Sequence, residues 1–503
     1  MRIPNVIFLS LFLTVAVSCR PDQSPSWQPE QTDPPDLNVS TLRQSKYNPR
    51  YLQYRGEHIV LITSAEHYGA VLNMDFDYVT YLETLEKEGF NYTRIFGGSY
   101  VEPADNIFGI LNNTLAPAPG GYLAPWKKVG ELYDLHEFSP AFFERLTHFM
   151  EEAEKRGIIV EMTLFSSIYA ENAWNRMPMN PGNNRSGMGA IDFRRVNTLF
   201  NGPLKDVQEH YIRKTVNELN RFDNLFFEIQ NEPWADNGNL VGYVNEEENE
   251  LFSRSWQKRV EVANGVALDW QAWVASVIRD EESNLPRKHL IAQNISNFKY
   301  SLDTLPPEVS IVNFHYALPE AVTGNPGIGG VIGLDETGFM PQKDEHYIRQ
   351  AWRFMMAGGG IYNNLDYSFT VGHERGEWPI PATNPGWGGP AFRKKLSLLA
   401  ETFAQIPFHE MSFSTSILDA TGPDLKQYGL FKEGEVYVVY VEHCRGNALV
   451  PAIPEGGYTV TGMDIHTGGQ QTVGIIHMDG QPLDISCGKG ELVLLIRSNN
   501  HSD

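Results

Sequence analysis

The sequence predicts an α/β protein: a (β/α)8 TIM barrel over residues 37–410, followed by a small all-β domain, a β-sandwich, over residues 411–503. In the first region apolar, strand-like runs alternate with amphipathic, helix-like stretches, and counting them gives close to eight β-then-α units. Such alternation implies a parallel sheet, and eight units over about 350 residues fit a closed barrel with long loops. After Met411 the helical period disappears, and short strand-like runs separated by Gly-rich turns replace it.

Hydrophobic periodicity places the individual elements. Strands are expected at 58–63, 91–96, 158–165, 225–229, 289–293, 310–314, 330–334 and 360–365, and in the last domain at 437–442 and 458–461. Helices are expected at 76–88, 140–156, 207–220, 268–280, 347–356 and 392–406. Ser139 is the expected N-cap of the second helix, and Gly157 ends that helix. A doubly wound open sheet is the alternative fold, but residues 64–69 after the first strand form no Gly-rich phosphate loop.

The N-terminus predicts export from the cell. An apolar run at 6–17 follows one early arginine and ends in small residues before Cys19, which is typical of a signal peptide at 1–18. That run is shorter than the roughly 20 residues that span a bilayer. Residues 16–19 resemble a bacterial lipobox, which implies a lipid anchor at Cys19 and a place in the cell envelope, periplasmic or surface-exposed; simple secretion is the alternative. The Pro-, Gln- and Ser-rich segment 19–36 is expected to be a tether.

Composition restricts the possible ligands. The net charge is -22, so we expect no nucleic-acid partner, because binding phosphate needs a basic surface. There is no His-Glu-x-x-His motif, no zinc-type Cys/His spacing and no Walker loop, so neither a metal nor another cofactor is expected. Cys444 and Cys487 lie in the C-terminal domain and either pair or remain separate thiols.

Two glutamates stand where the active site of such a barrel is built, at the C-terminal ends of its strands. Glu232 follows the fourth strand in Asn231-Glu232-Pro233-Trp234, and Glu336 follows the seventh. Glycoside cleavage needs two carboxylates, one protonated to donate to the leaving oxygen and one ionised to attack or stabilise the anomeric carbon. Because strands four and seven lie on opposite sides of a barrel, we expect Glu232 and Glu336 to be the catalytic pair. A separation of about 5 to 5.5 Å would predict retention of configuration, and about 6.5 to 9.5 Å inversion.

With these two motifs, residues 45–410 resemble clan A of the retaining glycoside hydrolases, which includes cellulases, mannanases and β-galactosidases. The resemblance implies that Glu232 is the general acid/base and Glu336 the nucleophile, that Asn231 binds the sugar 2-hydroxyl, and that Arg94 keeps the nucleophile ionised. It also implies that His315 and Tyr316, after strand six, contact the nucleophile and the reacting sugar.

At the family level, the opening residues 48–52 and the trailing β domain resemble cellulase-like and apiosidase-like bacterial proteins. One departure is that no tryptophan ends strand eight, where residues 362–366 stand.

Other candidate site residues also have a purely structural explanation. Arg94 could instead be a structural partner of Glu161 or Glu228. His67, after strand one, and Trp234 are further substrate-binding candidates, since an aromatic ring stacks on a sugar face. The other loop tryptophans could do the same or simply pack: Trp126, Trp174, Trp378 and Trp387. Four arginines after strand three could bind an anionic sugar, although surface solvation is the preferred interpretation: Arg176, Arg185, Arg194 and Arg195.

The sequence therefore predicts a retaining glycoside hydrolase that cleaves O-glycosidic bonds of an oligo- or polysaccharide by a two-glutamate double displacement, without a cofactor. One alternative is a non-catalytic, glycan-binding surface lipoprotein on the same scaffold. Another is that the C-terminal β domain is the functional part, as an adhesion or matrix-binding module. The sugar, the linkage and the choice between exo and endo action stay open.

Overall fold

The computed structural model describes residues 41–245, 250–420, 425–443, 447–450, 453–478, 483–486 and 491–499. The predicted signal peptide, the anchor at Cys19 and the tether lie outside the described residues, as do Cys444 and Cys487. None of the helices in the described ranges has both the length and the apolar content that crossing a membrane requires.

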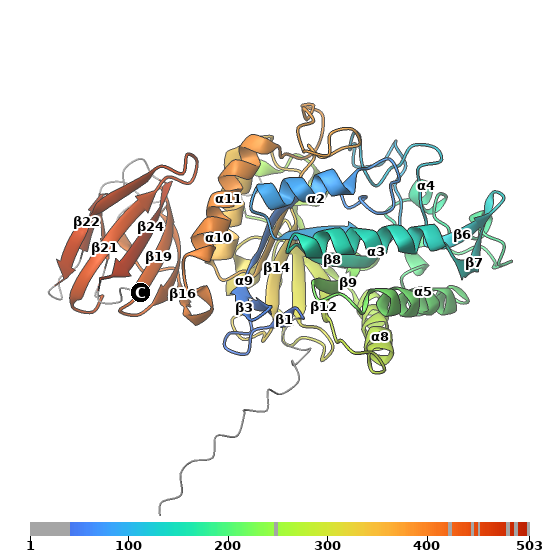
Figure 1. The fold of residues 1–503 in the computed structure, drawn as a ribbon, viewed down its shortest axis with the longest axis horizontal. Helices are drawn as coiled ribbons and strands as arrows, with labels where there is room; N and C mark the ends of the chain where they lie inside the picture. The colour runs from blue at the N-terminus through green and yellow to red at the C-terminus, as the bar shows by residue number, and fades with distance from the viewer. Residues whose placement is uncertain are drawn as a thin grey trace, which may run out of the picture. The chain divides into compact units, whose positions relative to one another are not determined.

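Eight parallel strands form the barrel, which confirms the predicted fold class (Figure 1). Their order around the sheet is β4–β15–β14–β13–β12–β9–β8–β5. The bounds are β4 (Leu61–Ala65), β5 (Tyr92–Phe96), β8 (Ile159–Ser166), β9 (Leu225–Asn231), β12 (Leu290–Asn297), β13 (Ile311–His315), β14 (Val331–Glu336) and β15 (Ile361–Leu365). Between β4 and β5 the Asn91 side chain bridges the strands, donating to the Val60 carbonyl at 2.8 Å and accepting from the Ile62 amide at 3.1 Å.

Helices surround the strands where the apolar periodicity predicts them. They are α2 (Tyr78–Lys87), α3 (Pro140–Lys155), α5 (Leu204–Leu219), α8 (Gly265–Glu282), α10 (Asp344–Met356) and α11 (Pro390–Ala404). Ser139 caps α3 by accepting from the Phe142 amide, and Gly157 follows its end with φ 68°. The alternation is not strict, since the described residues 298–310 between β12 and β13 form no helix and only the short α9 (Glu320–Thr323) separates β13 from β14.

The first predicted strand, 58–63, is wrong in its extent. Its beginning belongs to a separate antiparallel sheet of β1 (Arg43–Gln44), β2 (Leu52–Tyr54) and β3 (Glu57–Ile59), and only Leu61 onward enters the barrel. The sequence shows one apolar run because residues 59–62 are all apolar across the boundary between β3 and β4. The turn at Arg55 and Gly56, both with positive φ, closes the β2–β3 hairpin, so residues 57–59 pair with β2 before the chain enters the barrel.

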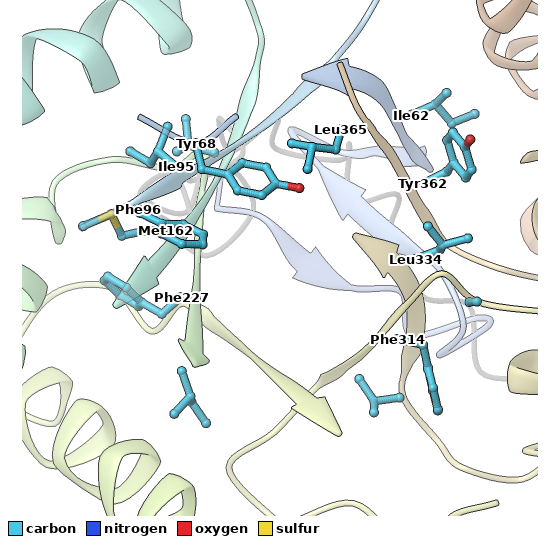
Figure 2. Packing of buried hydrophobic residues seen from close by; sticks show 14 of the residues in the cluster. Ile62, Tyr68, Ile95, Phe96, Met162, Phe227, Phe314, Leu334, Tyr362 and Leu365 are labelled. Carbon is cyan, nitrogen blue, oxygen red and sulfur yellow. The ribbon is translucent and has the colours of Figure 1, made fainter. Parts of the chain in front are cut away.

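Alternate residues of the barrel strands form distinct layers, because successive side chains of a strand point to opposite sides. One set makes an apolar layer at the N-terminal end of the barrel: Leu61, Tyr92, Ile159, Phe226, Ile311, Val331 and Ile361. Two positions further on, buried and mostly polar residues follow: Thr63, Arg94, Glu161, Glu228, Asn313 and Asn363. The residues that alternate with these along the strands, and so point to the other side, are apolar, such as Ile62, Met162, Phe314 and Leu334 in Figure 2. The polar layer therefore lies next to the C-terminal ends of the strands.

Two antiparallel hairpins were not expected. β6 (Trp126–Val129) and most of β7 (Leu132–Phe138) lie in the region predicted to be a loop, 97–136. β10 (Gly238–Tyr243) and β11 (Arg259–Ala263) follow the fourth barrel strand, and β11 extends to the edge of β12. β6, β7 and β10 are largely exposed, so their sequences lack the apolar alternation that marks a half-buried strand, whereas β11 alternates and buries Val260 and Val262.

The C-terminal region is all-β, as predicted, and entirely antiparallel. A six-stranded sheet contains β16 (Ser412–Ser414), β18 (Lys426–Lys432), β19 (Val436–Glu442), β24 (Glu491–Ser498), β21 (Gly456–Met463) and β22 (Gln470–Met478). A second sheet contains β17 (Asp419–Ala420), β20 (Asn447–Val450) and β23 (Leu483–Ser486). β19 is buried along its whole length, and Tyr440 packs against Trp352 of α10 with ring centroids 5.9 Å apart. The six-stranded sheet therefore packs directly on the barrel.

Candidate active site

Glu232 is held in an uncommon backbone conformation between β9 and the short helix α6 (Pro233–Asn237). Its φ is 47° and its ψ 52°, in the left-handed region that costs a non-glycine residue free energy. The backbone is fixed on both sides, because its amide donates to Asn294 Oδ1 at 3.2 Å and its carbonyl accepts from the Ser167 hydroxyl at 2.7 Å. The strain aims the carboxylate of a strand-end residue over the barrel mouth.

Glu336 is the last residue of β14, where the strand departs from regular pairing. Phe314 pairs with Leu334, but the next residue, His315, pairs with Glu336, so Asp335 is the extra residue of a β-bulge. A bulge redirects side chains, and here Asp335 and Glu336 both contact His315 although they are consecutive.

The two predicted catalytic carboxyl groups converge. The Tyr316 hydroxyl lies 3.0 Å from an oxygen of Glu232 and 3.0 Å from an oxygen of Glu336. His315 Nδ1 lies 3.0 Å from Glu232 and 3.6 Å from Glu336. Facing oxygens of the two glutamates are within 4.8 Å of each other. So close an approach favours the about 5 to 5.5 Å carboxyl separation of retaining glycosidases over the about 6.5 to 9.5 Å of inverting ones.

Arg94 contacts both Glu228, its partner under the structural hypothesis, and Glu336, the predicted nucleophile. Its Nε and Nη2 donate to Glu228 at 2.8 and 2.6 Å, and Nη2 also donates to Asn231 Oδ1 at 2.8 Å. Its Nη1 lies 3.3 Å from Glu336. Arg94 therefore has both the structural role and the site role, because its one guanidinium links the polar layer to the site above it.

Burial and charge set the protonation of the pair. Two carboxylates this close cannot both ionise cheaply, so they hold one proton over a wide pH range. Burial raises the pKa of Glu336 to about 7, even with the charge of His315 nearby. Burial also acts to raise the pKa of Glu232, but the hydrogen bond and charge of His315 and the hydroxyls of Tyr169 and Tyr316 outweigh it, so the pKa of Glu232 is lowered. Without substrate, the shared proton rests on Glu336.

His315 is the cation of the site. Burial acts to lower its pKa, but the charges of Glu336 and Asp335 raise that pKa well above the usual value. In the polar layer below, burial raises the pKa of Glu161 well above its usual value and that of Glu228 to about 7. Arg94 and His315 therefore balance a cluster of carboxyl groups of which part is neutral.

The other predicted residues are distributed differently. Asn231 lies beside the pair and donates to the Tyr169 hydroxyl at 2.7 Å. His67 lines the cavity above the pair, whereas Trp234 packs edge-on against His315 at 5.3 Å between ring centroids and does not line it. Four candidate tryptophans also do not line the cavity (Trp126, Trp174, Trp378, Trp387), and four arginines are exposed (Arg176, Arg185, Arg194, Arg195).

The cavity holds about 370 Å³ of space, including the part open to solvent. It is lined by His67, Tyr68, Phe96, Tyr100, Glu102, Phe108, Ile110, Leu115, Tyr169, Asn231, Glu232, Tyr316, Glu336, Phe339, Leu365 and Tyr367. Five of these non-glycine residues have positive φ, and such conformations cluster at functional sites: Tyr68, Tyr169, Glu232, Tyr316 and Phe339.

Sequence reasoning missed most of these aromatic residues and Glu102. Tyr367 stands two residues after β15 and Tyr169 three after β8, so a search of every strand end would have found both. Glu102 lies in the long segment after β5, where no sequence signal distinguishes it.

Two groups of side chains in the described residues have the spacing of metal ligands: Glu228, His315 and Asp335, and Glu232, His315 and Glu336. In both groups the His315 imidazole is held in its cationic form by the carboxylates, and a metal ligand must be neutral imidazole. The first group is also bound to Arg94. These residues favour proton chemistry over metal binding.

Comparison with known proteins identifies the fold. No family model matches the chain, and no curated protein matches its sequence. Among solved structures, a family 5 glycoside hydrolase from Bacteroides vulgatus superposes with a TM-score of 0.61 at 12% identity, covering 93% of this chain and 95% of that one. A second glycoside hydrolase gives a TM-score of 0.60 at 13% identity, covering 93% of this chain and 99% of that one. The structural neighbours are therefore glycoside hydrolases, and at these identities the likeness concerns the fold.

Proposed function

We propose that this protein is a retaining glycoside hydrolase, in which Glu336 is the nucleophile and Glu232 the general acid/base. The observation that carries the proposal is the convergence of two buried carboxyl groups, within 4.8 Å, over one cavity. This is the separation that allows direct attack by one carboxylate while the other donates a proton. The glycoside hydrolase fold of its neighbours supports the same reaction class.

The reaction has two steps. In the first, a Glu336 oxygen forms a bond to the anomeric carbon, the glycosidic bond breaks, and the Glu232 proton passes to the leaving oxygen. In the second, Glu232 takes a proton from water, the water oxygen binds the anomeric carbon, and the bond to Glu336 breaks. Each step inverts that carbon, so the product retains its configuration.

The neighbouring residues stabilise this sequence. Arg94 donates to Glu336 and so favours its charged form. Asn231 is oriented by Arg94 and Tyr169, and we propose that it binds the sugar 2-hydroxyl.

The proton must move before the first step. In the free protein it rests on Glu336, while the mechanism needs it on Glu232. The Tyr316 hydroxyl lies 3.0 Å from both carboxyl groups and offers the path: it gives its proton to Glu232 and takes the one on Glu336. Substrate binding would favour this exchange by placing the positive anomeric centre against an ionised Glu336.

Two variants separate the two roles. Wild type, Glu232→Gln and Glu336→Gln are assayed on aryl β- and α-glycosides of neutral sugars, with phenols of high and low acidity. Glu336→Gln should abolish hydrolysis of all of them. Glu232→Gln should spare the first step only for the most acidic phenols, which leave without protonation, and should accumulate a glycosyl ester on Glu336 detectable by mass spectrometry. Glu131→Gln, an exposed site with 96% side-chain exposure, is the matched control.

Other outcomes have clear meanings. If Glu336→Gln, rather than Glu232→Gln, spares the acidic phenols, the roles are reversed. If the first product seen by NMR has inverted configuration, the double displacement is wrong. Sugar binding by the wild type without turnover on any glycoside would instead support the glycan-binding lipoprotein.

A further inference from the structure

A third carboxyl group faces the cavity of the catalytic pair and has no part in the mechanism above. Glu102 lies in the loop after β5 and is only 6% exposed. One of its oxygens accepts from the Tyr100 hydroxyl at 3.1 Å and the other from the Asn113 amide. Among the described residues no cation forms an ion pair with Glu102. Burying an unpaired carboxyl group is costly, which calls for a reason other than stability.

Glu102 retains the capacity to bind a ligand. A carboxylate oxygen accepts two hydrogen bonds, and each Glu102 oxygen already accepts one, so each has one acceptor position left. Two acceptor positions on one carboxylate match two adjacent hydroxyl groups of a sugar.

Two further polar atoms in the cavity lack partners in the described part of the chain. They are His67 Nδ1 and the Tyr367 hydroxyl, both in side chains that are more than nine-tenths buried. Buried polar atoms are normally hydrogen-bonded, and unsatisfied ones at a cavity indicate a polar ligand. Together with Glu102, they line a cavity prepared for several hydroxyl groups.

The loop that carries Glu102 also covers the barrel mouth. From this loop, the Phe108 ring packs against Tyr169, which follows β8, at 5.1 Å between centroids, and against Phe339, which follows β14, at 6.3 Å. The Phe108 carbonyl accepts from Arg254 at 2.8 Å. The loop thus reaches across the strand ends.

The charge of the cavity restricts the sugar. Glu102, Glu232 and Glu336 all line it, whereas no lysine or arginine of the described part of the chain does. A uronate or sulfate on the bound sugar would meet these carboxyl groups without a cation to pair with. The cavity therefore suits an uncharged sugar.

Building on the proposed glycosidase function, we propose that Glu102 is a specificity-determining residue that binds two neighbouring hydroxyls of an uncharged sugar, and that the covered cavity admits only the terminal unit. The sugar whose anomeric carbon meets Glu336 is then the last one at the non-reducing end. The enzyme releases single sugars from that end.

The test pairs variants with deoxy substrates. kcat/KM is measured for wild type, Glu102→Gln and Glu102→Ala on the aryl glycoside with the fastest turnover and on its 3-, 4- and 6-deoxy analogues. Glu102→Ala should lower kcat/KM for the parent glycoside about 10- to 100-fold, the range expected for the loss of two hydrogen bonds. For an analogue that lacks one of the two contacted hydroxyls, wild type and Glu102→Ala should differ by only about 3- to 10-fold, because the wild type has already lost one of the two hydrogen bonds.

A structural role of Glu102 gives a different result, an equal loss for the parent and every analogue, and that result overturns the inference. Asp105→Asn, an exposed carboxylate in the same loop, is the control and should leave all values unchanged. If wild type and Glu336→Gln both hydrolyse nothing, the glycosidase proposal itself fails. If the wild type is active and Glu336→Gln is inactive, but the deoxy analogues do not show the expected differences, only the inference about Glu102 is wrong.

The product profile tests the terminal cleavage separately. Reducing-end-labelled tetrasaccharides of glucose, mannose, galactose and xylose are incubated with the wild type, and early products are separated by mass. The labelled trisaccharide should appear first, with free monosaccharide. Early labelled di- or monosaccharide would show internal cleavage and would overturn the terminal restriction.

Discussion

At the scale of single residues, the site depends on how charge is shared between groups that are far apart in the chain. Glu232, His315 and Glu336 contact one another, although more than eighty positions separate the first from the other two. The imidazolium is a consequence of that contact, because the charges of Glu336 and Asp335 raise the pKa of His315, whereas burial raises the pKa of Glu336.

This sharing predicts the pH dependence of catalysis. The competent pair holds one proton, which is lost as pH rises through the pKa of Glu336, about 7. It gains a second as pH falls through the lowered pKa of Glu232. kcat/KM should therefore be bell-shaped, falling about tenfold per pH unit above pH 7. A profile on a neutral aryl glycoside that stays flat to pH 9 would contradict the shared proton.

Most of the site residues that sequence reasoning identified share one property. Glu232, Glu336 and His315 lie at the ends of strands, and a barrel gathers those ends by construction; Arg94, in the middle of β5, reaches them from below. Glu102 lies in a loop whose path depends on contacts with other loops, so its sequence neighbourhood carries no comparable signal.

At the scale of elements, hydrophobic periodicity located all eight strands, and its errors occurred where two elements share one apolar run. The segment 58–63 combines the end of a hairpin with the start of β4. The exposed hairpin of β6 and β7 was missed because exposed strands need no apolar face.

The contact between β4 and β5, where the barrel closes, provides a test of barrel stability. Asn91→Ala removes the side chain that bonds to the Val60 carbonyl and the Ile62 amide, leaving buried backbone groups unpaired. The free energy of unfolding should fall by about 1–3 kcal/mol, as measured by urea denaturation monitored by tryptophan fluorescence. Asn217→Ala on the surface of α5 is a matched control. Unchanged stability in Asn91→Ala would mean that other contacts hold β4 and β5 together.

At the scale of the whole molecule, a buried ion pair fixes the six-stranded sheet of the C-terminal region to the barrel. Glu442 of β19 is fully buried, and Arg353 of α10 donates to it from Nε at 2.6 Å and also from Nη2. An isolated binding module would not need its sheet fixed to a barrel helix in this way.

This interface makes a prediction about stability. Arg353→Met should lower the free energy of unfolding by about 3–5 kcal/mol, because it leaves Glu442 buried without a partner. The double variant Arg353→Met/Glu442→Gln should recover part of the loss, since it removes the unpaired charge. Calorimetry of both variants against wild type gives the answer. Equal stability of all three would favour an independent C-terminal module, as in the adhesion hypothesis.

From the N-terminal sequence, we propose that the protein is exported and anchored to the membrane by a lipid. We expect the full chain, expressed in a Gram-negative host, to incorporate labelled palmitate and to sediment with membranes. Cys19→Ser should abolish both, because the thiol is the site of lipid attachment. Membrane association that persists in Cys19→Ser would indicate an uncleaved apolar segment instead.

The sequence by itself determined the alternation that closes a barrel, the all-β character of the last residues, and the two strand ends that carry the glutamates. These are properties of local periodicity, which each segment has before it meets any other. The tertiary structure alone decided the β-bulge that redirects Asp335 and Glu336, the left-handed backbone of Glu232, and the loop that brings Glu102 over the pair. These features arise from contacts between segments distant in the chain, and no local pattern records them.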